Sequence, residues 1–388
     1  MKILNLFSGV GSDIMAWERT NLPPITKVYH AEIDKYASAV DRRLHPQVIQ
    51  LGDVTKIKGA DLGHVDMILG GSPCQGFSFA NGNALAFDDP RSKLFFEFVR
   101  ILKELREINP KIHFFLENVK MKKEYRDVIT DQLGVHPIEL NSALDSAQNR
   151  KRLYWASWGI MPQIDKGIML GDILEDNVEG LDLSDAHKNR VLNTKRGKGY
   201  FYTKDSDKIG TLISGYHKIP TDGSYIQAER CIEVGHAEGI NGHDILKRVY
   251  SPNGKAPTLN AHGGGNTEPK VLCGAFRGRY LIDGKRQDHK MKTKGLTTQR
   301  LEVREDGKTN TLTTVQKDNV IVKQQHWRRL SPKECERLMT VEDDATLYGI
   351  DEDGKEIKIS NTQRYKMLGN GWVIDTIAHC LKYLEGKI

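Results

Sequence analysis

Two side chains in the amino-terminal part of the chain combine a reactive type with a position that suits catalysis. Cys74 lies in a Gly- and Ser-rich loop, residues 70–78, directly after an apolar run that predicts a buried strand. Such a cysteine can act as a nucleophile, although an isolated cysteine is more often a small buried hydrophobe. Glu117 ends a second apolar run, where a carboxyl group can protonate a ring nitrogen or form an ordinary ion pair. Because both residues follow strands, we expect them at the same edge of a sheet.

The first loop of the chain has the residues of a cofactor site. Gly9 and Gly11 follow the first apolar run, and glycines there let the backbone turn tightly and approach a ligand. The third glycine of the dinucleotide fingerprint is absent, and a lone GxG pair is often only a tight turn. Glu32 ends the second run and could accept hydrogen bonds from ribose hydroxyls, while Asp53 could hold an adenine amino group. Together these residues favour an adenosine-type cofactor without a pyrophosphate, and S-adenosylmethionine fits.

A basic segment precedes a later apolar run. Alternation along residues 148–155 places Gln148, Arg150 and Arg152 on one face, which suits contact with a nucleotide phosphate and a base oxygen. A charged turn is the alternative interpretation.

These groups need an α/β framework to position them. Apolar runs that predict buried strands cover residues 3–7, 28–31, 48–51, 65–69 and 112–116. Helical patterns lie between them, most clearly over residues 92–106, and two more runs at 138–140 and 153–158 could add edge strands. This alternation predicts a mostly parallel, doubly wound sheet that binds ligands at the carboxyl ends of its strands.

Composition excludes several classes of protein. With 388 residues, 38% hydrophobic and 28% charged, the chain can bury a sizeable core, and no apolar run is long enough for a membrane span. Its first apolar residues are too few for a secretory signal. The five cysteines are too widely spaced for a CxxC zinc site or a disulfide framework, so we expect no metal and a reducing cytoplasm.

The charge is divided between two parts of the chain. Residues 186–330 contain 27 basic and 14 acidic residues, a net charge of +13. The rest of the chain contains 30 basic and 37 acidic residues, a net charge of −7. The basic part is rich in Gly, Thr, Lys and Asn with short β-type runs, which favours a polyanion partner or simply a solvated surface. Helices are expected again from a capping box at Ser331 and over residues 372–384, with an acidic hairpin around 351–354 between them.

Six motifs occur in order along the chain. They are Phe7-Ser8-Gly9-Val10-Gly11, Ser72-Pro73-Cys74-Gln75, Glu117-Asn118-Val119, Gln148-x-Arg150-x-Arg152, Arg329-Leu330-Ser331-Pro332-x-Glu334-Cys335 and Gly369-Asn370-Gly371. Together they resemble the motif set of the DNA cytosine-5 methyltransferases over residues 1–160 and 326–388. The resemblance implies a Rossmann-like S-adenosylmethionine-dependent methyltransferase fold. It also implies a discontinuous catalytic domain, 1–180 and 326–388, and an inserted, smaller, mainly-β target-recognition domain, 181–325.

The resemblance implies a role for most of these residues. Cys74 would add to carbon 6 of a flipped-out cytosine in double-stranded DNA, Glu117 would act on ring N3, Arg152 would contact the base, and Arg150 would help to hold it. The cofactor-binding residues expected are Phe7, Gly9, Gly11, Glu32, Ile33, Asp53, Val54, Pro73, Leu94, Asn370 and Gly371. Residues expected to contact DNA are Gln75, Ser78, Gln148, Tyr216, His217, Asn266 and Gln316.

Two positions depart from the usual motifs. Where the family usually has two consecutive glycines, this chain has Gly11 followed by Ser12, a serine that could cap the following helix. The last motif, Gly369-Asn370-Gly371-Trp372, resembles that of the animal de novo subgroup more than the usual bacterial form.

Two rival functions share these motifs. A tRNA cytosine methyltransferase would have a much smaller variable region, and a non-catalytic DNA-binding homologue would typically lack Cys74 or Glu117. We therefore expect a DNA methyltransferase of a prokaryotic or phage setting, such as a restriction-modification enzyme.

Overall fold

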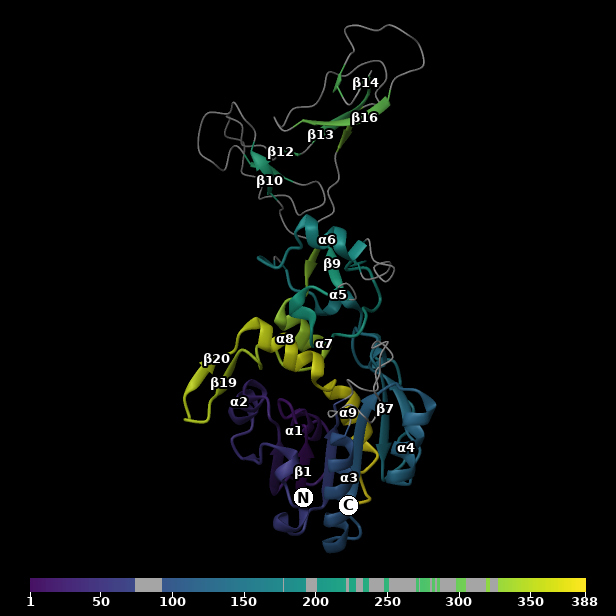
Figure 1. Ribbon diagram of the computed structural model, residues 1–388, viewed down its shortest axis with the longest axis vertical. Helices are drawn as coiled ribbons and strands as arrows, with labels where there is room; N and C mark the ends of the chain where they lie inside the picture. Colours follow the sequence, from purple (N-terminus) through teal and green to yellow (C-terminus); the bar gives the residue numbers. More distant parts are fainter. Residues whose placement is uncertain are drawn as a thin grey trace. The chain divides into compact units, whose positions relative to one another are not determined.

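The computed structural model describes residues 1–73, 93–176, 178–192, 201–220, 223–227 and 327–388, and the backbone of strands between residues 233 and 321. The chain divides into two compact units (Figure 1). Unit 1 contains Met1–Leu174, Asp185–Tyr225 and Arg329–Ile388, and unit 2 contains Glu175–Ser184 and Ile226–Arg328. Residues 185–225 therefore fold with the amino- and carboxy-terminal segments.

The described part of unit 1 is built on a seven-stranded sheet in the order β3-β2-β1-β4-β5-β7-β6. The strands are β1 Lys2–Leu6, β2 Lys27–Ala31, β3 Ile49–Gln50, β4 Met67–Gly71, β5 His113–Val119, β6 Ile138–Asn141 and β7 Lys151–Ala156. β1 to β5 pair in parallel, whereas β7 is antiparallel to both β5 and β6. The predicted mostly parallel α/β fold is confirmed. The expectation that both later runs form edge strands is wrong for β7, because its apolar residues are buried between β5 and β6.

Helices connect and cover these strands. They are α1 Ser12–Trp17, α2 Lys35–Leu44, α3 Leu94–Ile108, α4 Lys123–Leu133, α5 Leu170–Ile173, α6 Asp185–Leu192, α7 Pro332–Leu338, α8 Asn361–Asn370 and α9 Ile374–Lys382. The predicted capping box is confirmed, since Ser331 Oγ accepts from Glu334 N and the Glu334 carboxylate accepts from Ser331 N. Ser12 does not cap α1, because Gly11 is the cap residue and Ser12 is already helical.

Alternation along β1 separates the two faces of the sheet. Leu4 and Leu6 pack in one hydrophobic cluster with side chains of α3 and α4, including the fully buried Phe98. Burying such a side chain contributes roughly 1.5–3 kcal/mol. Asn5 points to the opposite face, where its amide donates to Asp13 of α1, and α1 packs against α9. Both faces of the sheet are therefore covered by helices.

The carboxy-terminal segment closes on α2. The predicted acidic hairpin forms from β19 Tyr348–Ile350 and β20 Glu356–Lys358 and packs beside α2 (Figure 1). Gly349 allows this contact, because a Cβ there would lie 2.8 Å from the backbone carbon of Ala39. Arg42 Nε also donates to the carbonyl of Ile350 at 2.9 Å. The carboxy-terminal hairpin thus packs against α2 and stabilises it.

The described elements of unit 2 are short strands, as the expected mainly-β insert requires. They are β10 Glu233–His236, β11 Arg248–Tyr250, β12 Lys270–Val271, β13 Cys273–Arg279, β14 Leu281–Ile282, β15 Lys285–Arg286, β16 Thr298–Arg304 and β17 Asn319–Ile321. β8 Phe201–Tyr202 belongs to unit 1, whereas β9 Tyr225–Gln227 and β18 Trp327–Arg329 each span a unit boundary in sequence. Across the described residues, no helix has the length and apolar character needed to cross a bilayer.

Candidate active site

The parallel register brings the candidate residues of unit 1 to one edge of the sheet. Gly71 at the end of β4 pairs with Glu117 on β5, and Leu6 of β1 pairs with both Ala31 and Gly70. The segments that follow these strands contain the expected cofactor and catalytic residues. This is the edge at which open α/β sheets bind their ligands.

The glycine loop turns immediately after β1. Phe7 and Gly9 have φ values of 62° and 60°, and Gly11 has 78°. The amide of Phe7 donates to the carbonyl of Ala31 at 2.8 Å, so the loop starts against the end of β2. No side chain fits at Gly11, because its Cβ would overlap the Asp41 carboxylate. Glycine is therefore required there both for backbone conformation and for packing.

Glu32 joins this loop to the segment after β2. Its Oε2 accepts from the Gly9 amide at 3.0 Å, and its Oε1 accepts from the amides of Ile33 and Asp34 at 2.9 and 2.8 Å. Burial raises the pKa of Glu32, and these backbone hydrogen bonds act in the opposite direction. Ile33 beside it is 76% exposed. Lys366 of α8 pairs with Asp34 at 2.6 Å, so the carboxy-terminal segment also supports this edge.

The remaining predicted cofactor residues of the amino-terminal half have structural partners in the described chain. Asp53 caps the short 3₁₀ helix η1, Val54–Lys56, by accepting from Thr55 N and Oγ1 at 2.9 and 2.8 Å. Val54 is buried, and Leu94 packs against the same core cluster. Pro73 is half-buried at the last described position before Cys74.

Glu117 and Arg152 form an ion pair that we did not predict from the sequence. Glu117 is 9% exposed at the end of β5, and Arg152 lies on the neighbouring β7. Arg152 Nε lies 2.9 Å from Glu117 Oε1. The indole Nε1 of Trp372 donates to Glu117 Oε2 at 3.3 Å. One oxygen of the Glu117 carboxylate therefore faces a cation and the other accepts a hydrogen bond, both from within unit 1.

Asn118 connects Glu117 to the loop that contains Cys74. Its Nδ2 donates to Ser72 Oγ at 3.0 Å and to the Ser72 carbonyl at 3.4 Å. Ser72 is two residues before Cys74, which itself lies outside the described residues, as do Gln75, Ser78, Asn266 and Gln316. We did not predict this role of Asn118, although its place directly after Glu117 was the available signal.

Gln148 and Arg150 contact the protein backbone. Gln148 is fully buried; its Nε2 donates to the Leu338 carbonyl at 2.7 Å and its Oε1 accepts from Leu212 N at 3.1 Å. Arg150 donates to the carbonyls of Leu212, Gly369 and Gly371 at 3.1, 3.3 and 2.8 Å. The side chain of Gln148 is therefore not proposed to contact DNA. Arg150 is proposed to position the backbone of residues 369–371. Through Arg150 the segment with the exposed Asn370 and the half-buried Gly371 is fixed to β7.

Tyr216 and His217 lie in unit 1. Tyr216 is buried, its hydroxyl donates to the Ser224 carbonyl and accepts from Leu330 N, and its ring packs edge-on against Tyr365. Burial raises the pKa of Tyr216 well above its ordinary value. A side chain with these contacts does not reach a base, so we leave Tyr216 out of the proposed DNA contacts. His217 is half-buried, with Nδ1 3.3 Å from the Ser214 carbonyl.

A buried charged network lies beneath the glycine loop. His30 Nε2 is 3.0 Å from Asp13 Oδ2, and His30 Nδ1 is 2.7 Å from Asp41 Oδ2. Asn5 donates to Asp13 at 2.7 Å, and Gln50 donates to Asp41 at 2.6 Å. We did not predict this network. The signal was that Asn5 and His30 are polar residues in apolar runs, and they are register partners on β1 and β2.

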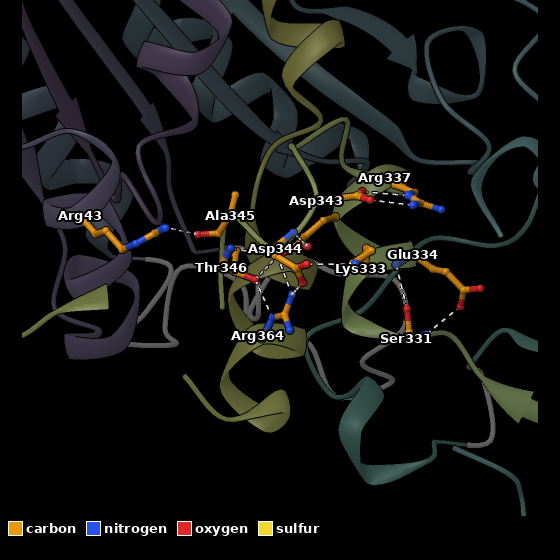
Figure 2. Close-up of polar contacts among 11 residues, drawn as sticks. Arg43, Ser331, Lys333, Glu334, Arg337, Asp343, Asp344, Ala345, Thr346 and Arg364 are labelled. Carbon is orange, nitrogen blue, oxygen red and sulfur yellow. Dashed lines mark hydrogen bonds and ion pairs between the residues drawn. The ribbon is translucent and has the colours of Figure 1, made fainter. Parts of the chain in front are cut away.

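A second network holds the carboxy-terminal helices together. Figure 2 shows Arg364 of α8 directed at Thr346 and Asp344; its Nε donates to Thr346 Oγ1 at 3.0 Å. The buried Glu336 of α7 accepts from Arg364 at 2.9 Å and from Thr346 N at 2.9 Å. Arg43 of α2 reaches the same segment at the Ala345 carbonyl (Figure 2). These contacts fix the helix that ends at Asn370. Within the described residues, no cluster of His, Cys, Asp or Glu suits a metal ion.

Comparison with known proteins agrees with this geometry. The family model described as C-5 cytosine-specific DNA methylase matches residues 1–385. The type II methyltransferase M1.ScrFI of Lactococcus lactis subsp. cremoris is 34% identical over 59% of this chain, which spans 64% of that relative. The orphan methyltransferase M.Rho11sI of Bacillus phage rho11s is 25% identical over 99% of this chain and 97% of its own.

Solved structures share the fold along the whole chain. A variant of Spodoptera frugiperda DNMT2 superposes with a TM-score of 0.56 at 18% identity and covers 99% of both chains. The Dnmt2 methyltransferase of S. pombe has a TM-score of 0.56 at 15% identity, covering 99% of this chain and 98% of its own. At these identities the likeness establishes the fold alone. Because the family model matches almost every residue, the chain belongs to the C-5 cytosine-specific DNA methylase family.

Proposed function

We propose that this protein transfers a methyl group from S-adenosylmethionine to carbon 5 of a cytosine within a specific sequence of double-stranded DNA. The observation that carries the proposal is the pairing of Glu117 with Arg152 beside the loop that leads to Cys74. Asn118 ties that loop to the end of β5. A nucleophile and a carboxyl group at one strand edge suit covalent catalysis on a pyrimidine ring.

Carbon 5 of cytosine is a poor nucleophile, so the protein must activate the ring. Cys74 as a thiolate adds to carbon 6, while Glu117 protonates or hydrogen-bonds N3 and the exocyclic amine. Electron density then moves to carbon 5, which receives the methyl group, and S-adenosylhomocysteine would remain as the second product. Loss of the proton from carbon 5 breaks the bond to the Cys74 sulfur and restores the thiolate. Arg152 holds Glu117 in place and, by family resemblance, contacts the base.

Unit 1 has features that fit S-adenosylmethionine, which supplies the methyl group when bound. Ser8 Oγ is buried without a hydrogen-bond partner among the described residues, and open space lies where a side chain at Gly9 would be. Glu32 Oε2 keeps acceptor capacity beyond its bond to Gly9, which suits a ribose hydroxyl. The exposed Ile33 beside it offers an apolar surface for an adenine ring. Asn370 and Gly371 would complete this site.

The basic middle of the chain is the proposed target-recognition domain. Its excess of Lys and Arg suits neutralisation of DNA phosphates, which contributes affinity without sequence information. A duplex hides carbon 5, so the cytosine must be flipped out at a cost of a few kcal/mol. Asn266, Gln316 and His217 remain candidates for contacts with DNA. The named relatives come from bacteria and phages, which supports a cytoplasmic setting.

Transfer of a labelled methyl group tests the proposal. Purified protein is incubated with S-adenosylmethionine labelled at the methyl group and with either duplex DNA or tRNA. We expect label in DNA alone, at one sequence that methylation-sensitive sequencing identifies. Label in tRNA alone would replace the proposed substrate, and no label with either, although the cofactor binds, would support a non-catalytic homologue.

A further inference from the structure

Two side chains from segments distant in sequence contact the carboxylate of Glu117. Arg152 Nε contacts Oε1 at 2.9 Å, and Trp372 Nε1 contacts Oε2 at 3.3 Å. Trp372 follows the Gly369-Asn370-Gly371 motif and lies in the same unit as the sheet.

Three features of the structure position the indole of Trp372. Arg150 binds the carbonyl of Gly371 at 2.8 Å and so anchors the preceding residue. The ring packs edge-on against Phe115, with centroids 6.0 Å apart and an interplanar angle of 85°. A Cβ on Gly71 would lie 2.7 Å from Trp372 Nε1 and 3.2 Å from Glu117 Oε2. Glycine at this position therefore leaves the space in which the indole and the carboxylate meet.

We propose that Trp372 is a positioning residue for Glu117, whose indole N–H orients the carboxyl group that acts on the cytosine ring. The inference rests on the proposed function, since it assumes that Glu117 acts on that ring. Partners on different oxygens resist rotation of the carboxyl group, because a turn of its plane breaks the hydrogen bond to Trp372 or lengthens the ion pair with Arg152. The indole nitrogen donates and cannot accept. A proton on Oε2 must then occupy the side facing away from Trp372, where it is free for the base.

The chain contains a matched control for this tryptophan. Trp158 also packs against Phe115, with centroids 5.9 Å apart, and the exposed fractions of Trp158 and Trp372 are 7% and 8%. The indole N–H of Trp158 also donates a hydrogen bond to a residue distant in sequence, but its acceptor is the backbone carbonyl of Cys380, at 2.9 Å, and not Glu117. Replacing either tryptophan by phenylalanine removes one N–H from the same aromatic cluster. Only Trp372→Phe removes a donor from Glu117.

The experiment compares Trp372→Phe and Trp158→Phe, each alone and combined with Glu117→Gln, in the full chain with DNA and S-adenosylmethionine. We measure kcat, the KM for each substrate, and thermal unfolding. A hydrogen bond to a charged group is worth enough to change a rate by about tenfold or more. We expect Trp372→Phe to lower kcat about tenfold with KM values unchanged within about twofold. We expect Trp158→Phe to lower the unfolding temperature similarly and to leave kcat within about twofold.

The double variants separate positioning from general damage. If Trp372 acts through Glu117, adding Trp372→Phe to Glu117→Gln should change kcat by less than about twofold. A tenfold loss that persists in the Glu117→Gln background, or equal kcat for the two Trp→Phe variants, would overturn the proposal. Should Trp372→Phe fail to fold, a tryptophan analogue with sulfur in place of the indole N–H can be incorporated at position 372. This analogue keeps the shape of the ring and removes only the donor to Glu117, so its kcat can be compared with that of the wild type in the same way. If the wild type methylates tRNA and not DNA, the proposed substrate fails, and the same variants are compared on tRNA.

Discussion

Raising the pH above neutrality is expected to destabilise unit 1 through His30. Burial lowers the pKa of this imidazole, but the ion pairs with Asp13 and Asp41 outweigh burial and raise the pKa to about 10. In the unfolded chain the pKa is about 6.5, so the native state holds one more proton between these two values. The stabilisation is fully present below about pH 6.5 and is lost as the pH rises toward about 10. The free energy of unfolding should fall by about 1.4 kcal/mol per pH unit, or about 2 kcal/mol between about pH 7 and 8.5.

Urea unfolding of the wild type and of His30→Gln at several pH values across that range measures this slope. For His30→Gln, the free energy of unfolding should not show this fall of about 1.4 kcal/mol per pH unit. At about pH 7 the variant should also be less stable by about 3–5 kcal/mol, because two buried carboxylates lose their cation. His64→Gln is the control, since His64 is exposed and pairs with Asp66 at the surface. Equal slopes for the wild type and His30→Gln would refute this reasoning.

Three substitutions, and a fourth that serves as a control, test other residues of unit 1 and the proposed nucleophile. Cys74→Ser should abolish turnover while DNA and cofactor affinities stay nearly intact, because an alkoxide is far harder to form than a thiolate; substantial methyl transfer would contradict this role. Gly11→Ala should cost at least about 2 kcal/mol and weaken cofactor binding, measured by titration calorimetry, because its φ of 78° and the adjacent carboxylate exclude a side chain. Arg364→Leu should lower stability by about 3–5 kcal/mol in thermal unfolding, because Glu336 stays buried without its cation. Arg337→Leu, at an exposed pair, should cost less than about 1 kcal/mol.

Local sequence signals predicted the framework of the catalytic unit. The periodicity of residues 92–106 placed α3, the Ser331 capping box placed α7, and apolar runs placed the strands of the sheet. The position of β7 was not predicted, because strand order depends on which edge of β5 is free. α8 was also not predicted, since its stability comes from buried contacts of Arg364 and Tyr365 with residues distant in sequence.

The candidate site was predicted only in part for a similar reason. Residue type and position at the end of an apolar run were enough to place Glu117 at the ligand-binding edge of the sheet, but they did not predict its ion pair with Arg152. Side-chain alternation could not reveal that Arg150 binds the carbonyl of Gly371, because that partner is 221 residues away. Tyr216 was predicted to contact DNA, but it is buried against Tyr365, which the local sequence did not indicate.

Release of tritium from duplex DNA labelled at carbon 5 of deoxycytidine tests the central claim most directly. Methyl transfer to carbon 5 must expel the hydrogen there, so tritium should enter the water in equal amounts with methyl groups incorporated into DNA. The release should disappear in Cys74→Ser. Methyl incorporation without tritium release would place the methyl group on another atom or base and would contradict the account.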